Sequence, residues 1–101
     1  MSDQLVRLHL PFRGMEDFDR WAELEERLGD AAERAQTGEL DGNEVGEGEY
    51  TIWLYGDSAA RLAETVRTAL VHEQLPPQCY LFVRHGDVSD ADAKEETISI
   101  S

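Results

Sequence analysis

The side chains best suited to chemistry are one cysteine and three histidines, because a thiolate beside an imidazole is a common enzyme nucleophile. Cys79 is predicted to share a strand face with Leu81 and Val83, whereas His9 is predicted to share one with Arg7. The two segments are predicted below to be neighbouring antiparallel strands, with Cys79 and His9 on opposite faces of the sheet. The sequence also contains no nucleophile elbow, phosphate-binding glycine loop or metal-spaced set of His or Cys. We therefore predict no catalytic residues and no enzyme activity.

The glycine-rich acidic segment 39–49 is a second chemical candidate, because its oxygen-bearing side chains could hold Ca²⁺ or Mg²⁺. Its spacing does not match an EF-hand loop, in which ligands alternate and glycine occupies the sixth position. The alternative is an edge strand whose charges prevent strand addition. We favour this alternative and predict no metal and no cofactor. The candidate ligands are Asp41, Asn43, Glu44, Glu47 and Glu49.

Composition limits the classes of partner. The chain has 101 residues, enough for one domain with one core, and carries 22 acidic against 9 basic residues, a net charge of −13. Such a charge repels nucleic acids and anionic membranes and favours a basic protein surface or a cation. The single cysteine excludes an internal disulfide and suits a reducing cytoplasm. We expect no signal peptide and no transmembrane segment, hence a soluble cytoplasmic protein.

Hydrophobic periodicity divides the chain into strands and helices. An alternating pattern predicts a strand, whereas apolar residues three and four apart, such as Trp21, Leu24 and Leu28, predict a helix. The final segment, 86–101, is expected to be a loop followed by either an edge strand or a frayed tail. The predicted strands are 4–10, 39–45, 50–55 and 79–85, and the predicted helices are 16–36 and 58–74.

This order, β-α-β-β-α-β, predicts an α+β, ferredoxin-like sandwich. Right-handed crossovers would place both helices on one face of a four-stranded antiparallel sheet. We expect the sheet order 4-1-3-2, with the strands at 4–10 and 50–55 central and parallel, and a short fifth strand at the C-terminal end as an option.

The sheet face that no helix covers, called the open face below, is the predicted binding surface. Aromatic residues and arginine are enriched at protein interfaces, and large exposed apolar patches usually mark one. The alternatives are that the tail or a loop crosses this face, or that the aromatic residues only stabilise cross-strand pairs. Alternation places Thr51 on this face beside the seven predicted partner-binding residues. These are Arg7, His9, Trp53, Tyr55, Tyr80, Phe82 and Arg84.

An RNA-binding sheet of this topology would also carry aromatic residues on its two central strands. Trp53 and Tyr55 would suit base stacking, but the first strand offers no aromatic residue and the net charge opposes phosphate. We therefore predict no nucleic acid partner.

The segment Gly38–Gly56 has an acidic glycine-rich hairpin, an aromatic strand that ends in Leu54-Tyr55-Gly56, and a following helix opened by an acidic residue. In these features it resembles a family of small uncharacterised bacterial proteins. The resemblance extends over about half of the chain, through the second helix. It implies a bacterial cytoplasmic origin and brings no catalytic or binding residue.

Together these patterns predict a non-enzymatic protein-interaction module, a homodimer joined through the open face. One alternative is an acidic inhibitor or immunity-type protein that neutralises a basic partner. Another is a small-ligand or divalent-metal-binding domain that uses the loop 41–49.

Overall fold

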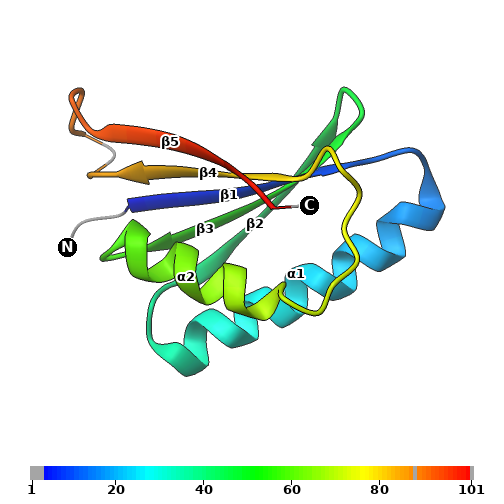
Figure 1. The fold of residues 1–101 in the computed structure, drawn as a ribbon, viewed down its shortest axis with the longest axis horizontal. Coiled ribbons are helices and arrows are strands. Elements are labelled where there is room, and N and C mark those ends of the chain that lie inside the picture. Colours follow the sequence, from blue (N-terminus) through cyan, green and yellow to red (C-terminus); the bar gives the residue numbers. More distant parts are fainter. Residues whose placement is uncertain (1–3, 88, 101) are drawn as a thin grey trace.

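The computed structural model describes residues 4–87 and 89–100, which fold into strands and helices in the order β-α-β-β-α-β-β (Figure 1). Residues 88 and 101 of the predicted 86–101 segment lie outside the described residues. Apart from the last strand and the second helix, each element begins and ends within one residue of its predicted bounds. The strands are β1 (Gln4–Pro11), β2 (Glu39–Gly46), β3 (Glu49–Gly56), β4 (Tyr80–His85) and β5 (Lys94–Ser99), and the helices are α1 (Met15–Ala35) and α2 (Ala59–Ala69).

The five strands form one antiparallel sheet in the order β2-β3-β1-β4-β5, so the fold is α+β with two helices and five strands. The expectation of four strands is corrected by β5, which pairs with β4. The expectation that 4–10 and 50–55 run parallel is wrong, because β1 and β3 are antiparallel neighbours. Each helical connection passes over one strand of the sheet. β1 and β2 are therefore parallel and separated by β3, and β3 and β4 are parallel and separated by β1.

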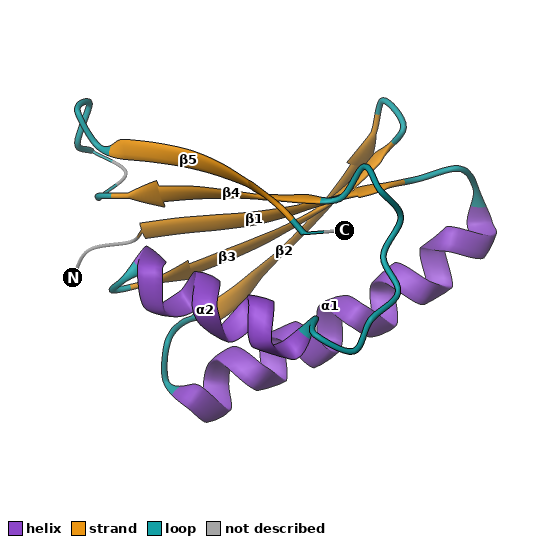
Figure 2. Ribbon diagram, viewed as in Figure 1, coloured by secondary structure: helices purple, strands orange, loops and turns teal. Residues whose placement is uncertain are grey.

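Both helices pack on the same side of the sheet (Figure 2). Alternate residues of the central strands face them and are fully buried, as are the apolar stripes of both amphipathic helices. Within the described residues, neither helix is long and apolar enough to cross a bilayer. The largest core side chains from the strands are Leu8, Leu10, Tyr50, Ile52, Leu54 and Leu81, and from the helices Trp21, Leu24, Leu28 and Leu62.

The helix predicted at 58–74 is shorter than expected, because α2 ends at Ala69, well before the two prolines. The segment that follows is held by α1 and by the core. Arg27 of α1 forms an ion pair with Glu73 at 3.1 Å, and Leu75 packs against the core. A continued helix would carry these residues away from both contacts, so tertiary packing overrides the helical pattern here.

The connection from α1 to β2 and the connection from β3 to α2 lie against each other without room for a side chain at Gly38 or Gly56. A Cβ on Gly56 would collide with the carbonyl oxygen of Thr37, and one on Gly38 with that of Tyr55. These contacts fix the end of β3, and with it the position of Tyr55.

Candidate binding face of the sheet

The structure brings all seven predicted partner-binding residues together on the open face. Residues paired across antiparallel strands share a face, and Arg7 of β1 pairs with Trp53 of β3 on one side and Phe82 of β4 on the other. His9 pairs with Tyr80 in the same way. The segment 94–99 does not cross this face, because it forms β5 at the edge of the sheet.

Arg7 occupies the centre of the face, clamped between two aromatic rings. Its guanidinium carbon lies 4.2 Å from the ring centroid of Phe82 and 5.1 Å from that of Trp53, which are cation–π distances. Its Nε is buried and has no hydrogen-bond partner, and among the described residues no carboxylate forms an ion pair with its guanidinium. Among the described residues, Arg7 is therefore a cation held between two aromatic rings without a carboxylate partner.

His9 lies next to Arg7 on the face and is 8% exposed. Its ring stacks on Tyr80 with centroids 4.3 Å apart and planes 7° apart. Its Nδ1 lies 3.3 Å from Oε1 of Glu49 and 3.5 Å from Oγ1 of Thr51, whereas its Nε2 is buried without a partner. Burial lowers the pKa of His9 more than the hydrogen bond to Glu49 raises it, so the ring is neutral at pH 7.

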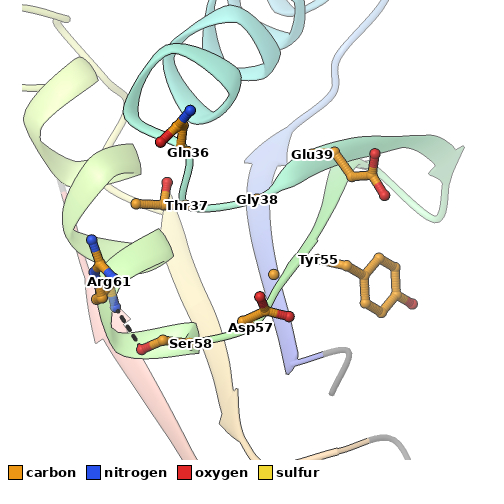
Figure 3. A pocket seen from close by; sticks show the side chains of 9 residues that line it. Gln36, Thr37, Gly38, Glu39, Tyr55, Asp57, Ser58 and Arg61 are labelled. Atoms are coloured by element: carbon orange, nitrogen blue, oxygen red, sulfur yellow. Dashed lines mark hydrogen bonds between the residues drawn. The ribbon is translucent and has the colours of Figure 1, made fainter. Parts of the chain in front are cut away.

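Arg84 and Tyr55 contribute to the face differently. Arg84 forms an ion pair with Glu95 of β5 at 2.5 Å and donates to the carbonyl of Asp90, so its charge is already balanced. Tyr55 lies at the end of β3, where it also lines a cavity of about 250 Å³ with residues such as Ser58 at the start of α2 (Figure 3).

The cavity in Figure 3 lies at the first turn of α2, where free backbone N–H groups could attract an anion. Two of these groups already have partners. The N–H of Ala59 donates to Oε1 of Gln4 at 2.8 Å, and that of Arg61 donates to Oγ of Ser58 at 3.3 Å. We therefore assign no anion site to this end of α2.

The open face is more tightly packed than alternation suggested. Its aromatic residues are half-buried, and the exposed large apolar side chains of the described residues lie elsewhere. Leu5, 8% exposed, and Thr51, 6% exposed, are buried on a face that no helix covers. The face is thus a preformed plate of mutually packed side chains. The exposed apolar residues are Met15, Phe18, Val45 and Val71.

Sequence reasoning did not assign three residues of this face: Leu5, Glu49 and Glu95. Leu5 pairs with Tyr55 and so extends the predicted alternation of β1 by one position. Glu49 lies two residues before Thr51 on β3, and this spacing could have identified it. Glu95 faces Arg84 across the β4–β5 pair, which no local pattern indicated.

The acidic segment forms a hairpin between β2 and β3, with its turn at Glu47 and Gly48. Across the described ranges 4–87 and 89–100, no group of three or more His, Cys, Asp or Glu side chains is arranged to hold a metal ion. The hairpin instead walls a cavity of about 440 Å³ on the open face, together with His9 and Trp53.

Cys79 lies in the core and is 1% exposed, on the opposite side of the sheet from His9. Burial raises the pKa of its thiol to about 11. The thiol is therefore protonated and shielded, unlike the exposed thiolate of a reactive cysteine.

A scan against protein-family models and searches of curated proteins and of solved structures found no match to this chain.

Proposed function

We propose that this chain is a non-enzymatic protein-interaction module that pairs with a second copy of itself through the open face. The observation that carries the proposal is the clamp of Arg7 between Trp53 and Phe82. Arginine and tryptophan dominate binding energy at interfaces. A side chain already held in one conformation loses little entropy on binding.

Charge complementarity favours a second copy as the partner. The centre of the face presents the guanidinium of Arg7, whereas the acidic residues Glu49 and Glu95 flank it on β3 and β5. Their side chains are 44% and 48% exposed, which leaves carboxylate oxygens free to accept further hydrogen bonds. A two-fold axis would bring the cation of one copy against a flanking acid of the other.

The burial of Cys79 and His9, the two candidate nucleophilic or basic groups considered above, supports a non-enzymatic role. The thiol of Cys79 is buried with a raised pKa, and Nε2 of His9 is closed to water. A buried free thiol also suits a reducing compartment, so we place the module in the cytoplasm. We further propose that β1–β4 and the two helices form a ferredoxin-like arrangement that β5 extends.

Sedimentation equilibrium over a concentration series tests self-association. The parent chain should reach twice its monomer mass at high concentration. Trp53→Ala and Phe82→Ala should each weaken association by about tenfold or more, as expected for a hot spot worth about 1.4 kcal/mol. Met15→Ala is the matched control, because Met15 is an apolar residue of α1 that is 72% exposed away from the open face.

A parent chain that remains a monomer at about 1 mM would overturn the proposal, because a dissociation constant above this value corresponds to a binding free energy weaker than about 4 kcal/mol. Equal effects of Met15→Ala and Phe82→Ala would do the same. Circular dichroism of each variant should keep the parent spectrum, which separates weakened association from unfolding.

A further inference from the structure

The cavity of about 440 Å³ beside Arg7 opens on the side of the open face nearest the β2–β3 hairpin. β1 and β3 form its floor through His9, Thr51 and Trp53, and the hairpin forms its wall through Glu44 and Glu47. The cavity is large enough for a small organic molecule.

Its lining is negatively charged. Three carboxylates, those of Glu44, Glu47 and Glu49, border the cavity, against one cation. That cation, Arg7, is held between two rings, and His9 is neutral because burial lowers its pKa. The cavity therefore favours a positively charged ligand, and the −13 net charge of the chain draws one toward it.

His9 forms part of the cavity floor and is nine-tenths buried. Its Nδ1 contacts the carboxylate of Glu49, which places the ring proton on Nδ1 and leaves Nε2 buried without a partner. The ring thus holds Glu49 at the edge of the cavity and adds no positive charge to its lining.

Gly46 lines the cavity on the hairpin side and has no side chain to fill it. Gly42 faces Trp53 across the β2–β3 pair and Gly46 faces Glu49, and a Cβ at either position would meet nothing within 4 Å. Arg7 covers one face of the Trp53 indole, and Gly42, its register partner on β2, has no side chain to cover the other. An electron-rich indole face beside carboxylates is a recurring arrangement for recognition of organic cations.

We propose that this cavity binds a small organic cation that bears primary ammonium groups, such as a linear diamine. Its N–H groups donate to the carboxylates of Glu44 and Glu49, and its methylene chain lies along Trp53. Phe82, a proposed contact for self-association, does not line this cavity.

Calorimetric titration of the full chain with putrescine tests the proposal, at about 0.1 M salt, where the Debye length is about 10 Å. We expect saturable one-to-one binding, accompanied by a change in indole fluorescence that is absent from Trp53→Leu. Glu44→Gln should weaken binding by about tenfold or more, as loss of a charge-assisted hydrogen bond predicts. Gly46→Val, which fills the cavity, should also weaken it.

Glu39→Gln is the matched control, because Glu39 is an exposed acid of the same strand and face that does not line the cavity. Equal weakening by Glu39→Gln and Glu44→Gln would reveal only counterion binding and would overturn the proposal. Absence of saturable heat, or equal or tighter binding of magnesium chloride, would also overturn it.

Two further arms separate related explanations. Nα-acetyl-lysine methylamide carries the same ammonium as a partner's lysine side chain, and tighter binding of this compound than of putrescine would overturn assignment to a free amine. Phe82→Ala and the parent, both kept below the concentration at which the parent pairs, should bind putrescine alike. Failure of the amine site and failure of the proposed dimer are thus observed separately.

Discussion

The guanidinium of Arg7 stacks on the ring of Phe82, its register partner on β4, at 4.2 Å. Trp53, the register partner on β3, lies on the other side of the same guanidinium. Three adjacent strands of the sheet thus meet through a single cation at the centre of the open face.

Arg7→Lys should destabilise the fold even though it keeps the charge. A lysine ammonium lacks the planar surface that stacks on both rings, and cation–π contacts are worth about 0.5–2 kcal/mol. We expect the free energy of unfolding, measured by urea denaturation, to fall by about 1 kcal/mol. Arg67→Lys, on the exposed face of α2, is the control and should change it by less than about 0.5 kcal/mol. Equal effects of the two variants would contradict a structural role for the clamp.

His9 should make stability depend on pH. Its folded-state pKa lies below the ordinary value of 6.5, so the unfolded chain binds the proton more readily. Its contribution is therefore fully present above about pH 6.5 and is lost as the pH falls below that value. The groups that face it are Glu49, Arg7, Thr51 and Tyr80.

The difference between the parent and His9→Gln isolates this contribution from the titration of other groups. Urea denaturation between pH 8 and pH 5 should show a steeper loss of stability for the parent. His72→Gln, at an exposed position after α2, should follow the parent curve. Parallel curves for the parent and His9→Gln would exclude His9 as the titrating group.

Gly56→Ala should be strongly destabilising. The added Cβ would strike the carbonyl oxygen of Thr37, and relief requires the backbone to move, at a cost of about 1–3 kcal/mol. Gly46→Ala adds the same methyl group where nothing lies within 4 Å and should change stability by less than about 0.5 kcal/mol. Thermal unfolding of the pair measures the difference, and similar melting temperatures would show that the two connections separate easily.

Cys79 should be protected from thiol reagents in the folded protein. It is 1% exposed, and burial raises its pKa to about 11, so little thiolate exists at pH 8. Reaction with a chromogenic disulfide should be slow in buffer and complete in denaturing urea. Rapid labelling without denaturant would mean that β4 separates readily from the core.

The sequence carried enough information to place the seven residues on one face. Arg7 and His9 are two residues apart, as are Trp53 and Tyr55, and this local spacing puts both members of each pair on the same side of a strand. It could not predict which neighbours balance these side chains. Glu95 is paired with Arg84 by the β4–β5 register, and Glu49 preceded the predicted start of its strand. The expectation that β1 and β3 run parallel was wrong because the helical connection keeps β1 and β2 parallel, and the β2–β3 hairpin then reverses β3 relative to both.

The central place of β1 in the sheet has a consequence for the order in which the chain can acquire structure. β1 pairs with β3 on one side and with β4 on the other, and β4 is completed only at His85. The edge of β1 that pairs with β4 therefore stays unpaired until the chain has been made through β4. Contacts between residues so distant in sequence slow folding. We therefore expect the sheet to close only after β4 has been made, and the unpaired edge of β1 to benefit from protection until then.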